Sequence, residues 1–157
     1  KLIGNGRVKT LIASHVGLNP TVAKLMNAGA LELILVPQGT LAEQIRAKGA
    51  GLGGILTPTG LGTLVQEGKQ VIEVDGKKYI LEKPMKADLA IVEATYADPF
   101  GNGVNIGTTR NFNPLMALAA DVVVMGTYEV REPGKIDPSI VTIHGVLVDY
   151  LVEIVEA

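Results

Sequence analysis

The feature that most constrains the fold is the stretch LVPQGTLAEQIRAKGAGLGGILTPTGLGT at residues 35–63, where a strand-like end runs into a helix and then into a long loop without charges. The apolar, β-compatible run at residues 31–36 stops at Pro37, and helical sequence follows almost at once. A strand that leads directly into a helix is the repeating unit of α/β folds. This stretch therefore predicts an α/β architecture.

Sequence signals at both ends define the predicted helix. Thr40 and Glu43 have the spacing of a capping box, in which the threonine caps and the glutamate bonds back, so the helix is predicted to begin near Leu41. Lys48 and Gly49 supply the basic last turn and the glycine stop of a helix C-terminus. The capping role accounts for Glu43 without a catalytic function.

Gln38 and Gly39 are left at the corner between the strand and the helix. In open α/β sheets ligands bind at this corner, beyond the carboxyl end of a strand, and a helix N-terminus adds amide donors suited to a carboxylate or a developing oxyanion. Gln38 is therefore a candidate neutral hydrogen-bond donor to a ligand.

The loop at residues 50–63 contains five glycines, three threonines and no charge. Glycines let a backbone approach either a ligand or a second subunit closely. Packing against a neighbour and contact with a ligand both fit this composition. The loop has neither the GxGxxG nor the GxxxxGK[ST] spacing, so it does not indicate a nucleotide-phosphate cradle.

Short β-type runs occur throughout the chain. Residues 8–14, 31–36, 87–94 and 121–125 have the pattern of buried strands, and helical segments separate them. Residues 71–81 alternate apolar and polar side chains around an Asp-Gly pair, the strongest short-range signal of a hairpin. The alternation predicts a mostly parallel, three-layer sheet with a projecting β-hairpin.

Two further helices have start signals in the sequence. Asn19 followed by Pro20 is an N-cap with proline at the first helical position, and Gly29 is expected to end that helix. Asn113 is expected to cap a second helix that runs through Ala120.

The composition indicates a globular protein, because 47% of the residues are hydrophobic and 19% are charged. Residues 1–157 are predicted to form a single domain without a membrane-spanning segment. A formal net charge of -2 without a basic cluster argues against a nucleic-acid partner. The absence of cysteine suits a cytoplasmic protein, and the two histidines lack the spacing of a metal site. His15 follows a strand end on the ligand edge of the sheet without an acid partner, so both a hydrogen-bonded loop residue and a contact with the site fit it, and His144 is interpreted as structural.

Four motifs in order carry a family resemblance: PQGTLAEQIR (residues 37–46), GAGLGGILTPTGLGT (49–63), Gly101-Asn102 and RNFNP (110–114). Together they resemble the α subunit of the bacterial acetate/butyrate-acetoacetate CoA-transferases, the two-subunit relatives of succinyl-CoA:3-oxoacid CoA-transferase. The resemblance implies the CoA-transferase type of three-layer sheet, which is shared with isomerases and deaminases. It also implies that the domain is N-terminally incomplete, because such subunits begin with a segment carrying a GGF-containing glycine loop that helps hold coenzyme A.

The resemblance further implies a reaction that moves coenzyme A between a short-chain acyl-CoA and a carboxylate or 3-oxoacid acceptor. The nucleophilic glutamate is expected on a β subunit, in an α2β2 assembly, so this chain would be active only with β. Coenzyme A is implied as a substrate, with no covalently bound cofactor and no metal. Gln38 is the implied oxyanion donor, and the residues implied at the pocket or the subunit seam are Gly39, Gly53, Gly54, Thr57, Thr59, Gly60 and Asn111.

Two alternatives stay open on sequence grounds. The chain could be a non-catalytic truncated scaffold that pairs with β, or a sugar-phosphate-binding protein of the same architecture. The second requires a lysine or an acid-base set in a pocket, whereas the lysines at positions 48, 69, 83 and 86 occur in turn-like or exposed contexts. For Asn111, shaping the partner's site and touching substrate are both consistent with the motif.

Overall fold

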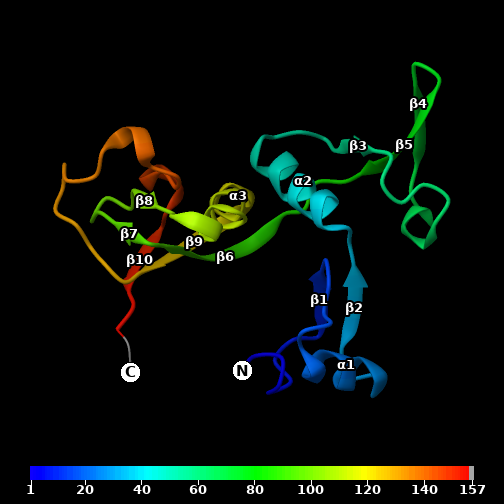
Figure 1. The fold of residues 1–157 in the computed structure, drawn as a ribbon, viewed down its shortest axis with the longest axis horizontal. Helices are drawn as coiled ribbons and strands as arrows, with labels where there is room; N and C mark the ends of the chain where they lie inside the picture. Colours follow the sequence, from blue (N-terminus) through cyan, green and yellow to red (C-terminus); the bar gives the residue numbers. More distant parts are fainter. Residues whose placement is uncertain (156–157) are drawn as a thin grey trace. The chain divides into compact units, whose positions relative to one another are not determined.

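The computed structural model describes residues 1–155. The chain forms an α/β fold with parallel sheets, as predicted (Figure 1). It divides into two compact units. Unit 1 comprises Lys1–Leu41 and Leu56–Glu82, and unit 2 comprises Ala42–Ile55 and the chain from Lys83 onward.

The first half of the chain contains three helical segments and five strands. In order these elements are β1 (Thr10–Ala13), α1 (Pro20–Asn27), β2 (Glu32–Leu35), α2 (Gln38–Gly49), β3 (Ile55–Thr57), the 3₁₀ helix η1 (Leu64–Gln66), β4 (Val71–Val74) and β5 (Lys77–Glu82). The second half continues with β6 (Ala87–Ala94), β7 (Tyr96–Ala97), β8 (Gly103–Val104), η2 (Gly107–Arg110), α3 (Asn113–Ala119), β9 (Ala120–Thr127), η3 (Pro138–Ile140), η4 (Gly145–Leu147) and β10 (Tyr150–Glu153).

In unit 1, β1 and β2 pair in parallel, with Ala13 opposite Leu35 at their carboxyl ends. Helix α1 connects them, and its predicted start is confirmed because the Asn19 side chain accepts a hydrogen bond from the Thr21 backbone. Gly29 follows the helix with a left-handed φ of 68°. Glycine adopts this conformation without steric cost, so its predicted role as the helix stop is confirmed.

The predicted hairpin is formed by β4 and β5, which pair antiparallel from Val71 opposite Ile80 to Val74 opposite Lys77. Asp75 and Gly76 both have positive φ, 50° and 74°, as a type I′ turn requires. Strand β3 completes a three-stranded sheet in the order β3-β5-β4. The sequence did not predict β3, because its three residues lie within the glycine-rich loop.

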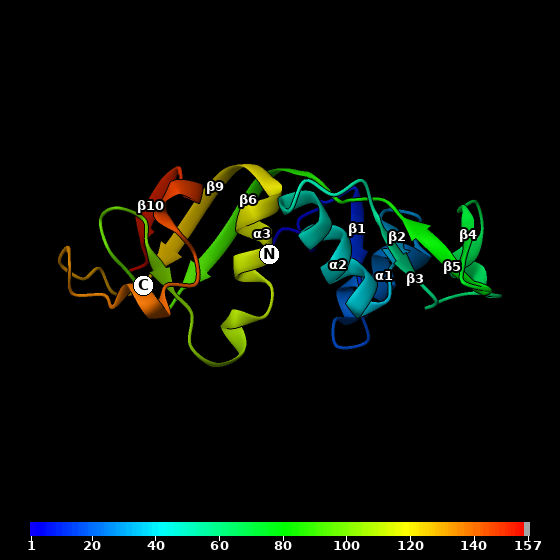
Figure 2. The same ribbon diagram turned by 90° about the horizontal axis from the view of Figure 1, so that it is seen from above.

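Unit 2 is built on a three-stranded sheet in the order β10-β9-β6, with both pairings parallel. Helix α3 runs along β6 and β9 (Figure 2). Between them lies the core of this unit, which contains Ala90, Val92, Ala94, Ala97, Ala117, Val123, Met125 and Ile143.

Helix α2 corrects the predicted helix start. It begins at Gln38, and the Pro37 carbonyl already accepts the first helical bond from the Leu41 amide at 2.9 Å. Thr40 is buried within the helix at 4% exposure and cannot serve as its N-cap. Glu43 does not reach back to it and instead forms an ion pair with Arg46 at 2.7 Å.

The C-terminus of α2 also differs from the prediction. Gly49 is the last helical residue, and the left-handed cap is Gly51 at φ 68°. The Gly51 amide donates to Lys48 and the Leu52 amide donates to Ala47, which is the Schellman pattern. Gly49 has a different role, because a Cβ there would lie 2.5 Å from the Leu118 side chain.

Helix α3 corrects the predicted cap at Asn113. The N-cap residue is Phe112, and Asn113 is the first helical residue. The Asn113 side chain instead accepts from the Glu93 amide at 3.0 Å and donates to the Thr109 carbonyl at 2.9 Å. It therefore ties the start of α3 to β6 and η2.

Within residues 1–155, none of the helices combines the length and apolar character needed to cross a lipid bilayer.

Candidate functional site

Gln38 and Gly39 form the first turn of α2, directly beyond the carboxyl end of β2. Both residues are exposed. The Val36 amide donates to the Ala13 carbonyl, which keeps the corner at the edge where β1 and β2 both end. The predicted donor is therefore solvent-accessible at the sheet edge that binds ligands in open α/β folds.

His15 lies at the same edge, two residues after β1 ends at Ala13. Its ring Nδ1 is 3.0 Å from the hydroxyl of the adjacent Ser14. This bond is what we expect of a loop histidine, and the side chain is exposed.

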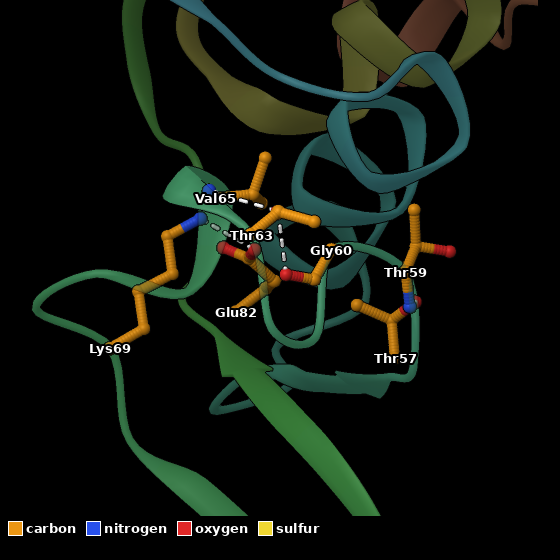
Figure 3. Close-up of polar contacts among 7 residues, drawn as sticks. All are labelled: Thr57, Thr59, Gly60, Thr63, Val65, Lys69 and Glu82. Atoms are coloured by element: carbon orange, nitrogen blue, oxygen red, sulfur yellow. Dashed lines mark hydrogen bonds and ion pairs between the residues drawn. The ribbon is translucent and has the colours of Figure 1, made fainter.

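Thr57, Thr59 and Gly60 lie together in unit 1, where β3 ends (Figure 3). The Thr59 amide donates to the Thr57 hydroxyl at 3.2 Å, which closes a local turn. Gly60 has φ 92°, and a Cβ there would lie 2.6 Å from Val65 Cγ1. Only glycine fits this position without strain. The structure thus brings three of the predicted site residues into one short segment.

After Gly60 the chain folds into three consecutive turns that end at Lys69, which we call the turn segment (Gly60–Lys69). In each turn a backbone amide donates to the backbone carbonyl three residues earlier, at 3.0–3.1 Å: Thr63 to Gly60, Gln66 to Thr63, and Lys69 to Gln66. Side chains reinforce these turns. The Thr63 hydroxyl donates to the Gly60 carbonyl and accepts from the Val65 amide, as Figure 3 shows. The Gln66 side chain accepts from the Gly62 amide at 2.8 Å.

Sequence reasoning missed one partner of this segment. Glu82, the last residue of β5, is only 2% exposed, and its Oε1 accepts from Lys69 Nζ at 2.7 Å. The available signal was the strand alternation, because Glu82 has the same phase as buried Ile80 and therefore faces the same side.

Three predicted site residues belong to unit 2. Gly53 and Gly54 follow the cap of α2, and a Cβ at Gly53 would meet no atom within 4 Å. Asn111 is exposed directly after η2, and its amide donates to the Thr108 carbonyl. These positions leave backbone and side-chain groups accessible.

The Gly101-Asn102 motif lies in a loop of unit 2 that folds around a buried carboxylate and that we call the Asp98 loop (Asp98–Asn102). Asp98 is 5% exposed, and its carboxylate accepts from the Phe100 amide, the Asn102 amide and the Asn102 side chain at 2.9–3.0 Å. The Asn102 carbonyl oxygen Oδ1 accepts from the Gly145 amide at 3.0 Å. The motif residues are therefore engaged in holding the loop.

Among residues 1–155, three carboxyl groups have perturbed pKa values, and none of the three belongs to a predicted site residue. A hydrogen bond from Arg46 holds the pKa of Glu43 below its usual value, and Arg131 does the same for Glu129. The backbone amide of Ser139 lowers the pKa of Asp137. These groups stay ionised at neutral pH, as stable partners of their donors do.

In the part of the chain that the structure describes, no cluster of three or more histidine, aspartate or glutamate side chains is arranged to hold a metal ion. The candidate site consequently offers amide, hydroxyl and backbone donors, which suit carbonyl and carboxylate oxygens.

A family model described as coenzyme A transferase matches residues 1–154. The chain belongs to the coenzyme A transferase family. This CoA-transferase chain is 50% identical over 151 residues to the acetate CoA-transferase subunit alpha of Escherichia coli K12, an alignment that covers 96% of this chain and 69% of that protein. It is 46% identical over 153 residues to the acetoacetyl-CoA:acetate/butyrate CoA transferase alpha subunit of Clostridium acetobutylicum, covering 98% of this chain and 70% of that subunit.

Solved structures agree with the family assignment. The apoenzyme of an acyl-CoA transferase from Escherichia coli O157:H7 matches with a TM-score of 0.84 and 25% identity, over 94% of this chain and 32% of that one. Its thioester complex with CoA gives a TM-score of 0.82 at 26% identity, over the same shares. The resemblance to CoA-transferase α subunits and the α/β fold class are thus confirmed.

Proposed function

We propose that this chain is the α subunit of a heteromeric CoA-transferase that moves coenzyme A between a short-chain acyl-CoA and a carboxylate or 3-oxoacid acceptor such as acetate, butyrate or acetoacetate. One observation carries the proposal: half of the aligned residues are identical to an acetate CoA-transferase α subunit, over 96% of this chain. The family model spans both units, which supports a single domain over residues 1–157. Acyl-CoA substrates and the lack of cysteine favour the cytoplasm.

In the proposed reaction a glutamate of the β subunit attacks the thioester carbonyl of the acyl-CoA. The tetrahedral oxyanion collapses, expels the CoA thiolate and leaves an acyl-glutamyl anhydride. The thiolate then attacks the glutamyl carbonyl, which releases the first carboxylate and forms a glutamyl-CoA thioester. An acceptor carboxylate runs these steps in reverse, so that covalent catalysis divides one difficult step into easier ones.

The nucleophile is assigned to the partner because no glutamate of this chain lies in a motif that resembles the surroundings of the family's nucleophile. Three of the described glutamates, moreover, already pair with cations. Glu43 and Glu129 pair with Arg46 and Arg131 on the surface. Glu82 is buried against Lys69. A carboxylate that is paired with a cation is a weaker nucleophile, because the cation stabilises the negative oxygen whose electron pair would attack the carbonyl.

Gln38 is the residue of this chain assigned to the reacting carbonyl. Its exposed side-chain amide at the start of α2 can donate to an oxyanion without a change of protonation state. Gly39 beside it has no side chain to obstruct the approach of a substrate. Thr57, Thr59 and Gly60, together with Gly53, Gly54 and Asn111, are proposed to line the acyl pocket or the seam with the β subunit of an α2β2 assembly.

The proposal is tested by mixing the purified chain with a CoA-transferase β subunit from the same organism and assaying CoA exchange from acetyl-CoA to butyrate or acetoacetate. Each subunit alone is the control. Exchange in the mixture only is the expected result. A stable complex without exchange would instead support a non-catalytic scaffold, and binding of a sugar phosphate in place of acyl-CoA would support the isomerase-like alternative.

A further inference from the structure

One partly buried ion pair joins the end of the turn segment to β5. Glu82 at the end of β5 is 2% exposed, and the Lys69 side chain is 31% exposed. The Lys69 ammonium donates to Glu82 Oε1 at 2.7 Å, and Figure 3 shows the two side chains meeting beside Gly60 and Thr63. This pair links the last residue of the turn segment to the neighbouring strand.

The turn segment transmits the position of Lys69 back to Gly60. Backbone hydrogen bonds close the three turns in sequence, so Lys69 is connected through Gln66 and Thr63 to Gly60. The chain beyond it is fixed too, because the Leu81 amide donates to the Gln70 carbonyl at 2.8 Å. Gly60 itself lies so close to Val65 that an added Cβ would be 2.6 Å from its Cγ1.

An apolar side chain could occupy the position of Glu82, so packing alone does not require a charged pair here. Glu82 shares the face of fully buried Ile80, where an apolar side chain would pack without losing hydration. The attraction within a buried ion pair is largely offset by the cost of removing both groups from water. A charge-assisted hydrogen bond does, however, fix one direction and one distance. The pair is therefore better suited to defining a conformation than to adding stability.

We propose that Lys69 and Glu82 are positioning residues that set the conformation of the turn segment and, through it, the selectivity of the acyl site for its carboxylate acceptor. This inference rests on the proposed function, in which Thr57, Thr59 and Gly60 line that site. The pair acts on acceptor binding, because Gln38 and the partner's glutamate, which carry the bond-making step, lie outside the turn segment.

The first arm of the test needs no activity. Amide hydrogen exchange is measured in the assembled protein for Lys69→Met, with Lys86→Met as the matched control that removes the exposed pair with Asp121. The Gly62 and Val65 amides, which are bonded to Gln66 and Thr63, are expected to exchange at least about tenfold faster in Lys69→Met only. Unchanged exchange at both amides would overturn the positioning role.

The second arm separates positioning from stability. The double variant Lys69→Met/Glu82→Gln removes both charges and is expected to recover the melting temperature lost in Lys69→Met, because no ionised carboxylate stays buried. Its KM for the acceptor is still expected to rise about tenfold, while kcat changes less than about twofold. This pattern is expected because the acceptor is bound less tightly in the ground state and in the transition state alike. The ratio of kcat/KM for acetate to that for butyrate is expected to shift as well.

A purely structural pair would give a different pattern. The double variant would then recover both the melting temperature and the wild-type acceptor ratio, which would overturn the inference. Failure of the proposed function is recognised separately, because the wild-type assembly would then transfer no coenzyme A at all, whatever the amide exchange shows.

Discussion

The turn segment of unit 1 and the Asp98 loop of unit 2 are both tight loops that carry or adjoin family motifs, yet they use their polar groups differently. In the turn segment, side chains bond to neighbouring backbone and the surface stays open, so that Leu64 is 82% exposed. In the Asp98 loop Phe100 is likewise 70% exposed, but a single buried carboxylate, 5% exposed, accepts the three hydrogen bonds that hold the loop.

This difference separates a loop that can meet a ligand from one that supports the fold. An exposed loop whose turns are held by hydrogen bonds within the loop keeps its shape and leaves its outer surface available for binding, as binding loops on a rigid scaffold do. A buried polar network is costly to disturb, because each group that loses its partner also lacks water. We therefore expect substitutions in the first region and at Gln38 to change activity, and substitutions in the Asp98 loop to change stability.

The largest effect is expected for Gln38→Ala in the assembled enzyme. Loss of one oxyanion donor should lower kcat by ~10²–10³, or about 3 kcal/mol of transition-state stabilisation. Assembly should survive, because the side chain is exposed. Steady-state kinetics check this, with Gln70→Ala as the control at another exposed glutamine. Equal turnover in the two variants would remove Gln38 from the site.

The opposite behaviour is expected for Asp98→Ala. Three partly buried donors lose their acceptor, so the free energy of unfolding should fall by about 2–3 kcal/mol. The kcat of the folded enzyme should be unchanged well below the melting temperature. Urea denaturation and kinetics on the same sample measure both quantities. A large loss of kcat with normal stability would place the Asp98 loop in the active site and break the contrast.

A smaller loss of stability is expected for Gly60→Ala. The left-handed φ of 92° costs a residue with a Cβ about 1–2 kcal/mol. Overlap with Val65 adds to this cost. Gly53→Ala is the matched control, because its Cβ would meet no atom within 4 Å. Urea denaturation should rank the two variants in this order, and equal stabilities would show that the turn segment can relax.

The smallest effect is expected for Gly39→Ala, with the reverse sign. Alanine in a helix is favoured over glycine by about 0.5–1 kcal/mol, and the added Cβ would meet no atom within 4 Å. Stability should therefore rise slightly. If Gly39 admits the substrate, KM should rise in the same variant. A more stable enzyme with unaltered KM would leave Gly39 without a role in binding.

Much of the fold could be predicted because its signals are local. The hairpin follows from Asp75-Gly76, the only such pair between two alternating runs, and α1 follows from the Asn19 cap and Gly29. Strand β6 spans the predicted residues, Ala87–Ala94. In each case the residues that determine the element lie within it or beside it.

The errors arise where a distant partner overrides a local signal. Thr40 has the sequence of a cap, but burial of its side chain within α2 moves the helix start to Gln38. Asn113 also resembles a cap, but its amide side chain bonds to the Glu93 backbone, twenty residues away. No local pattern encodes these contacts.

The candidate site shows the same division. The exposed corner of Gln38 follows from the order of strand and helix, and the structure agrees with it. The pairing of Lys69 with Glu82 spans thirteen residues and a hairpin, so only the strand phase of Glu82 hinted at its burial. The proposed roles of Asn111 and Gln38 depend further on a partner subunit, whose contacts a single chain does not encode.

The most direct test of the central claim, that this chain shapes a site whose nucleophile belongs to its partner, is to locate the covalent intermediate. The assembled enzyme is incubated with acyl-CoA alone, quenched in acid and examined by intact-mass spectrometry of both subunits. We expect a CoA thioester on the β subunit and none on this chain. A CoA adduct on this chain would contradict the claim and would place the nucleophilic carboxylate among its own residues.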